Sequence, residues 1–220
     1  MATFNELHAE AHTRGNIRKS LRTVGFIGRR SEVDPPTSLF AGGSIVDLFE
    51  EGFLAIGLVT VDGFNFERED SNDEVRSQGF LSATREDLES SERTTSFTAQ
   101  EVQKRVIKEL CDGARYDSVS VDDGEAIFFK PEFPENDEWC LVVVSFDGVE
   151  GNDYLDAKVL PTIKIQTVSG EQFGGDGERN REITARVYVD DELNVPEIDI
   201  IGGEGFLRDA ESLGYEGAGS

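Results

Sequence analysis

The sequence predicts a mainly β (α+β) fold, a β-sandwich or barrel with one flanking α-helix and extended arms at both ends. Apolar runs of strand length recur between turn residues from about residue 53 to residue 189. A single segment combines helical spacing with capping residues. The stretches before residue 44 and after residue 200 are rich in proline, glycine or charge. We therefore expect a body over 44–200, an N-terminal arm over 1–43 and a C-terminal extension over 201–220.

The N-terminal arm is expected to be basic and irregular. Prolines 35 and 36 and glycines 42 and 43 disfavour regular structure. Residues 1–30 hold six basic and two acidic side chains, a net charge of +4. Because the whole chain has a net charge of −24, the other 190 residues carry −28. A basic arm can dock on the acidic body of the next copy, and a disordered basic tail is the equally weighted alternative. The residues expected to make such contacts are Arg14, Arg18, Lys19 and Arg22.

The body is expected to begin with a hairpin. An apolar run over 53–59 is followed by Asp62-Gly63, a frequent two-residue hairpin turn, and then by a strand over 64–69. Phe64 and Phe66 alternate with polar side chains, so they lie on one face of that strand. The opposite face carries Asn65, Glu67 and Glu69.

An acidic loop over 70–79 and a second strand pair, over 80–88 and 92–97, are expected next. Between residues 67 and 92 there are nine acidic residues and only three arginines. The acidic loop is a candidate for contacts between stacked copies, and its candidate residues are Asp70, Asp73, Glu74 and Arg76.

One helix is expected over 99–111. Thr98 and Glu101 have the spacing of a capping box, and Gly113 stands where a C-terminal glycine cap belongs. The later segments predict strands over 126–129, 139–146, 158–165 and 183–189, with Pro161 marking an edge or a bulge.

Composition argues against several kinds of function. The net charge of −24 disfavours a nucleic-acid binder, because phosphate contacts need lysine and arginine. No apolar run approaches the roughly 20 residues of a membrane helix, and residues 1–10 lack a secretory signal. We expect synthesis in a cytoplasm, with Cys111 and Cys140 as reduced thiols rather than a disulfide or metal pair.

No motif predicts catalysis. His8 and His12 have metal-pair spacing but lie in the expected arm, and the glycine-rich segment 174–177 lacks the context of a phosphate or calcium loop. The body has no histidine for a nucleophilic dyad. A glycosidase-type carboxylate pair stays open, since nothing selects one pair among 45 acidic residues. We expect no catalytic residues, no metal and no cofactor.

The order of these segments resembles the major tail protein, the tail-tube subunit, of siphovirus-type long-tailed bacteriophages. The similarity covers roughly residues 50–195 and is carried by an ordered set of segments, including the Asp62-Gly63 hairpin, the acidic stretch, the run 92–98 with its following helix, and the strands over 139–147 and 182–191. The basic arm and the glycine-rich tail match the family less well.

The resemblance implies a structural virion protein rather than an enzyme. In that family six subunits form a ring, and rings stack into a hollow tube through which DNA passes without specific binding. Its partners would be its own copies and the tail terminator, tape measure and distal tail proteins, and it would be made in the cytoplasm of the host bacterium and end in the virion tail. The candidates for residues that line the channel are Asn65, Glu67, Glu69, Glu86 and Asp87, and the carboxylates among them would repel phosphate.

Two alternatives remain at this point. The chain can be another tail or capsid component, such as a terminator or a decoration protein. It can also be an acidic β-sandwich module that binds sugar or calcium, in which case calcium would stabilise a monomer.

Overall fold

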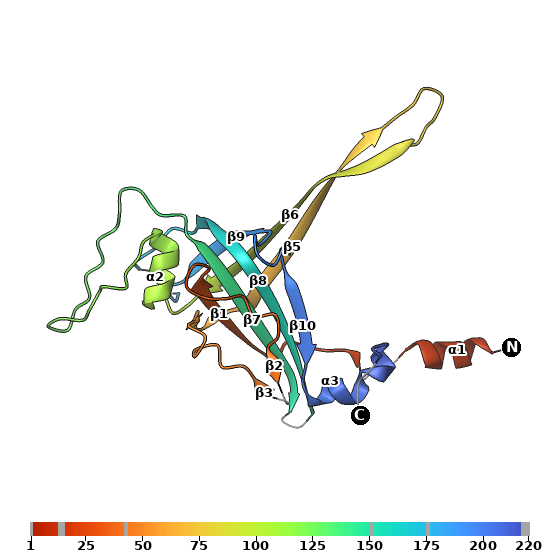
Figure 1. Ribbon diagram of the computed structural model, residues 1–220, viewed down its shortest axis with the longest axis horizontal. Helices are drawn as coiled ribbons and strands as arrows, with labels where there is room; N and C mark the ends of the chain where they lie inside the picture. Colours follow the sequence, from red (N-terminus) through yellow and green to blue (C-terminus); the bar gives the residue numbers. More distant parts are fainter. Residues whose placement is uncertain (1, 13–15, 42–43, 150–151, 175–176, 217–220) are drawn as a thin grey trace.

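The computed structural model describes residues 2–12, 16–41, 44–149, 152–174 and 177–216 (Figure 1). It is 44% strand and 11% helix, which confirms the prediction of a mainly β protein. Within the described residues, no helix combines the length and the apolar character needed to cross a membrane. The strands are β1 (Arg22–Arg29), β2 (Phe40–Ala41), β3 (Ser44–Ile45), β4 (Leu54–Ala55), β5 (Val59–Val75), β6 (Arg85–Ala99), β7 (Glu138–Val149), β8 (Asn152–Val168), β9 (Arg181–Tyr188) and β10 (Ile198–Gly202). The helices are α1 (Phe4–Ala11), α2 (Arg105–Asp112) and α3 (Glu204–Asp209), followed by a 3-10 turn, η2 (Glu211–Leu213).

Eight strands form one antiparallel sheet in the order β4-β1-β7-β8-β9-β6-β5. The eighth strand, β10, pairs with the first half of β8, whereas β9 pairs with its second half. Strands β2 and β3 form a separate two-stranded ribbon. This arrangement replaces the two stacked sheets of the expected sandwich with one open sheet.

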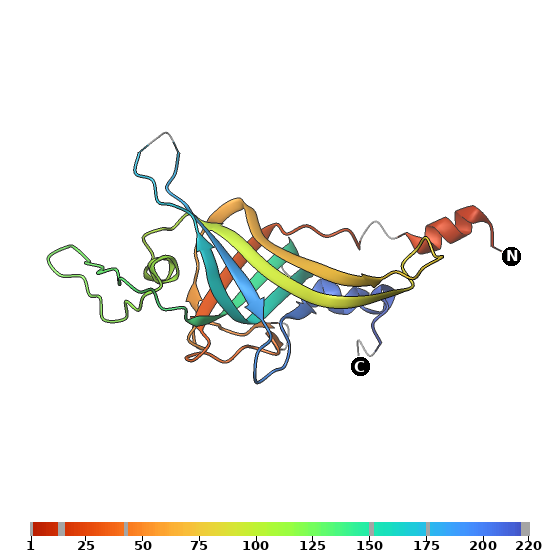
Figure 2. The ribbon, with the colours of Figure 1, turned by 90° about the horizontal axis from the view of Figure 1, so that it is seen from above.

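The sheet is strongly curled. A Cβ atom added to Gly25 of β1 would lie 2.3 Å from the ring of Phe64 on β5, so the strand at one edge of the sheet passes over a strand near the other edge. The view from above shows this curl (Figure 2). The concave side encloses an inner core in which Leu141 of β7, Leu160 of β8 and Ile183 of β9 pack with Ile107 of α2.

A second core lies on the convex side and covers only part of the sheet. Leu39, Leu48 and Phe53, from the connection between β1 and β4, pack against Val142 of β7 and Val159 of β8. The run at the start of β7 is therefore buried on both sides, as its continuous apolar sequence predicts. Pro161 lies where the pairing of β7 with β8 shifts register, which confirms the expected bulge.

The predicted Asp62-Gly63 turn is wrong. Both residues lie inside β5, where the pairing with β6 shifts register between Val59 and Phe64, and Gly63 adopts a φ of +70°. A glycine with positive φ suits a β-bulge as well as a turn, so the dipeptide alone does not distinguish them. Strand β5 then continues to Val75 and pairs with β6 in one long hairpin, in place of the expected loop over 70–79 and separate strand over 80–88.

The predicted helix over 99–111 begins late. Thr98 and Ala99 belong to β6 and pair with β9, and the helix starts only at Arg105. The Glu101 carboxylate accepts the Leu58 N–H at 2.7 Å instead of closing a capping box. The cap at Gly113 is confirmed, with left-handed backbone and its N–H donating to the Glu109 carbonyl.

Both predicted extensions are partly built into the body. Residues 22–29 form β1, whose Ile27 is fully buried, so the arm expected over 1–43 is wrong from residue 22 onward. Beyond residue 200, β10 ends at Gly202 and α3 packs on β8, where Gly205 lies against Tyr154. The strand expected over 126–129 is wrong: the loop 113–137, which the structure describes in full, contains only an isolated bridge between Asp122 and Glu125.

Candidate assembly surfaces

The convex side of β5, β6, β9 and the second half of β8 is a bare polar surface, which we call the polar face. It lies opposite the inner core, because Phe97, Ile183 and Ala185 point to the concave side and their strand neighbours point away. This face extends across three strands, because Glu67 of β5 pairs with Thr94 of β6, and Thr94 pairs with Arg186 of β9. Its members are Asn65, Glu67, Glu69, Glu92, Thr94, Ser96, Lys164, Thr184, Arg186 and Tyr188.

The polar face carries both paired and unpaired charge. Arg186 binds Glu92 at 2.6 Å and Lys164 binds Glu138 at 3.0 Å, so the two cations of this face are neutralised locally. Glu67 accepts a hydrogen bond from the Asn65 amide at 2.7 Å. Among the described residues, no basic side chain lies within ion-pair distance of Glu67 or Glu69. The face is therefore rich in hydroxyl groups and negative at the β5 edge.

Three of the five channel candidates lie together and two do not. Asn65, Glu67 and Glu69 share the polar face, as alternation predicts. Glu86 pairs with Glu74 and Asp87 pairs with Asp73, so neighbouring residues of β6 place these two carboxylates on opposite faces of the hairpin's outer half. The outer half projects beyond the body (Figure 1), which separates both from the polar face over the core.

The outer half of the β5–β6 hairpin holds the candidates for contacts between stacked copies. Asp70, Asp73, Glu74 and Arg76 are all exposed there. Arg68 binds Asp70 at 2.7 Å and Arg76 binds Glu74 at 3.0 Å, both within one strand and its turn. Arg85 likewise binds Asp87 at 2.5 Å. Among the described residues, Asp73, Glu86 and Glu89 of this outer half have no cationic partner.

The basic N-terminal candidates contact their own subunit. Arg14 lies outside the described residues. The Arg18 guanidinium stacks 3.3 Å from the centre of the Tyr154 ring, and the Lys19 N–H donates to Asp147 at 3.1 Å. Arg22 lies 4.4 Å above the ring of Phe146. Residues 18–22 therefore lie along the end of β7 and the start of β8 of their own subunit, and docking on another copy stays a prediction.

The candidates chosen from the sequence include only three of the ten residues of the polar face. Glu92, Lys164, Arg186 and Tyr188 lie far from Glu67 along the chain and join it only through the strand order. The sequence does contain a signal for part of this face: apolar and polar residues alternate over 183–189, which places Thr184, Arg186 and Tyr188 on one side of a strand.

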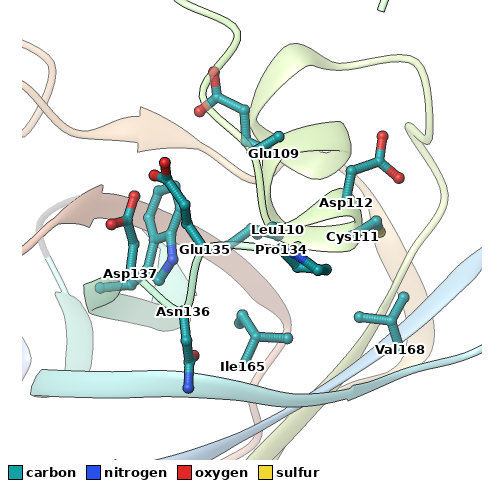
Figure 3. A pocket seen from close by; sticks show the side chains of 13 residues that line it. Glu109, Leu110, Cys111, Asp112, Pro134, Glu135, Asn136, Asp137, Ile165 and Val168 are labelled. Atoms are coloured by element: carbon teal, nitrogen blue, oxygen red, sulfur yellow. The ribbon is translucent and has the colours of Figure 1, made fainter. Parts of the chain in front are cut away.

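A pocket beside α2 is the structure's nearest approach to a chemical site (Figure 3). It has a volume of about 180 Å³ and lies between α2 and residues 134–137, with Trp139 among its lining residues. Its buried Glu109 binds Arg29 at 2.9 Å and accepts the Tyr116 N–H, so the carboxylate is held in structural contacts. Burial raises the pKa of the Cys111 thiol to about 11, which leaves it protonated at neutral pH.

Cys111 and Cys140 are both free thiols, and burial raises the pKa of Cys140 to about 12. His8 lies on α1 and His12 directly follows that helix, with the two rings stacked 4.3 Å apart. In the part of the chain that the structure describes, no cluster of three or more histidine, cysteine or acidic residues is arranged to hold a metal ion. No protein-family model matches the chain, and no curated protein is significantly similar to it.

Proposed function

We propose that the chain is the repeating subunit of a hollow tube, the tail tube of a long-tailed bacteriophage, assembled from stacked rings. The observation that carries the proposal is the polar face, a broad sheet surface with a packed core behind it and, among the described residues, no covering layer in front. A soluble protein can leave such a surface in water, but a tube subunit needs one to line its channel.

The charge of this face suits the passage of DNA. Its cations are neutralised by Glu92 and Glu138, and Glu67 and Glu69 remain unpaired among the described residues. A wall of hydroxyl groups and carboxylates gives phosphate no strong site, so DNA would slide rather than bind. In this proposal Glu67 and Glu69 face the channel.

Free strand edges supply the means of ring formation. Strand β5, with 17 residues, is the last strand of the sheet, so one side of its backbone has no partner strand in the part of the chain that the structure describes. Such an edge pairs readily with a neighbouring copy. A head-to-tail contact that closes gives a ring, and a second contact along another direction gives a filament.

Electron microscopy of the purified full-length chain tests the proposal. We expect long hollow polymers with a regular axial repeat and an open channel. A density map of those polymers must place Glu67 and Glu69 on the channel wall. Solid filaments, or a protein that stays monomeric at high concentration, would contradict the tube, and a map with both residues buried between subunits would contradict the lining.

A further inference from the structure

The tip of the β5–β6 hairpin is apolar although it stands in solvent. Phe80 is 69% exposed and Leu81 is fully exposed in the turn between the two strands. Turn residues at the end of a projecting hairpin are ordinarily polar. Adjacent exposed aromatic and aliphatic side chains on an otherwise charged projection indicate a contact with another molecule.

An apolar groove lies on the convex side of the body, beside the second core. It has a volume of about 400 Å³, enough for a pair of large side chains, and among its lining residues are Val24, Phe26, Phe49 and Phe146. Val24 is 47% exposed and Phe49 is 60% exposed, so the described residues leave the groove uncovered. The Asp47 carboxylate also lines it and accepts the Phe49 N–H at 2.9 Å.

The hairpin is acidic, and one side of the groove is basic, although the lining also includes the acidic Asp47. Residues 67–92 hold nine acidic and three basic side chains, a net charge of −6. The groove is bordered by Arg22, whose guanidinium lies over the Phe146 ring, and Lys19 is three residues before it. Among the described residues, neither side chain has an acidic partner within ion-pair distance.

The two features lie at opposite ends of the subunit. The hairpin tip projects to the top right of Figure 1, whereas the connected ends of β7 and β8, which carry Phe146 and Leu155 of the groove, lie at the bottom. A projection at one end and a recess at the other form a head-to-tail contact that does not close on itself, which generates a filament.

We infer that the groove receives the hairpin tip of a second copy of this chain. Phe80 and Leu81 enter between Phe26, Phe49 and Phe146, and Arg22 meets the carboxylates of the hairpin stem. The inference rests on the proposed function and specifies the contact by which one ring holds the next.

Two variants with complementary defects test this contact. The first variant carries Phe80→Ser and Leu81→Ser, which remove the apolar tip. The second carries Val24→Glu, which places a carboxylate in the groove. All three side chains are about half exposed or more, and circular dichroism checks that both variants fold. We expect each variant alone to need at least a tenfold higher concentration to polymerise, measured by sedimentation velocity and electron microscopy. Mixed in equal amounts, the two variants should form pairs but no longer polymers. The intact tip of one variant fills the intact groove of the other, and the pair then has no intact tip or groove left.

The matched control is Phe133→Ser, which removes an exposed phenylalanine (80% exposed) from the loop before β7 and should polymerise like the wild type. Polymerisation of the tip variant at the wild-type concentration would overturn the contact while leaving the tube intact. Conversely, solid wild-type filaments that still require Phe80 and Val24 would refute the tube and support the contact. A wild-type chain that stays monomeric, and variants that do not pair, would refute both.

Discussion

Asp190 is the residue on which the connection after β9 depends. Its side chain is 2% exposed and accepts hydrogen bonds from the Arg30 Nε at 2.7 Å and from the Thr162 hydroxyl at 2.8 Å. It also accepts the N–H groups of Glu192 and Leu193, which closes the turn after β9. The Arg30 hydrogen bond in particular holds the pKa of Asp190 well below its usual range. One carboxylate thus joins the residues that follow β1 and β9 to the interior of β8.

Asp190→Asn should destabilise the protein by about 3 kcal/mol at pH 7, because it leaves the Arg30 guanidinium with less compensation in a largely buried site. The folded-state pKa of Asp190 is depressed, so its stabilisation is present above the unfolded-state value near 4 and is lost as the pH falls toward the folded-state value. Urea unfolding at pH 7 and pH 3 should therefore show a smaller difference between variant and wild type at pH 3. A difference that is the same or larger at pH 3 would contradict this account.

Arg29 shows why single residues are hard to assign from sequence. In the sequence it is one of six basic residues in an expected arm, but it is 4% exposed and binds Glu109 at 2.9 Å and Asp137 at 3.0 Å. Its partners are 80 and 108 residues away along the chain. Local composition carries no information about such distant partners, whereas the alternation that placed Glu67 and Glu69 on one face is local and was predictable.

At the scale of elements, the periodicity of apolar residues predicted strands correctly, whereas residues typical of turns and helix caps led to wrong predictions. The alternating residues of β9 and the apolar run of β7 are strands as expected. Asp62-Gly63 forms a bulge, and Thr98 pairs in β6 rather than capping a helix, because each local signal fits two structures and the neighbouring strand decides between them. The late start of α2 has the same cause.

The curl of the sheet depends on a glycine in β1. Gly25→Ala should destabilise the protein by about 1–3 kcal/mol, since the new methyl group would lie 2.3 Å from the Phe64 ring and push β5 away from β1. Gly170→Ala is the matched control, because its added Cβ meets nothing within 4 Å and its backbone is not in the left-handed region. Equal urea midpoints for the two variants would show that β5 does not need this close approach.

The outer half of the hairpin should be dispensable for folding. Replacing residues 72–89 by Asn-Gly joins the paired residues Ser71 and Ser90 through a two-residue turn. No residue in the removed segment belongs to either core, so the unfolding free energy should stay within about 1 kcal/mol of the wild type. Urea denaturation measures this, and electron microscopy of the same sample should show no long polymers. A chain that fails to fold would show that the hairpin stabilises the body.

At the scale of the whole molecule, acidic and basic side chains are concentrated in different places. The hairpin carries −6 over residues 67–92, and the basic side chains of residues 18–22 border the opposite end. Like subunits of net charge −24 repel one another unless opposite charges meet locally. Head-to-tail stacking satisfies this condition, because the acidic hairpin of one copy then meets the basic residues 18–22 of the next, and salt screens this attraction as well as the general repulsion.

Reversing charge on the polar face tests whether it lines a channel for DNA. Glu67→Lys with Glu69→Lys changes the charge of each subunit by +4 and adds cations to a face whose two existing ones are already paired. In an assembled tube these lysines repeat around every ring, so a short DNA duplex should sediment with the variant polymers and be released steeply by salt. Wild-type polymers should leave the duplex in solution.

The control for that experiment changes charge elsewhere by the same amount. Glu125→Lys with Glu132→Lys alters two exposed residues of the loop between α2 and β7, which lies away from the polar face. If the polar face is the channel wall, duplex held by the Glu67 and Glu69 variant is enclosed and resists nuclease, whereas duplex held by the control is digested. Equal binding and equal digestion in both variants would place the polar face on the outside of the assembly, because only an enclosed surface restricts access by a protein the size of a nuclease.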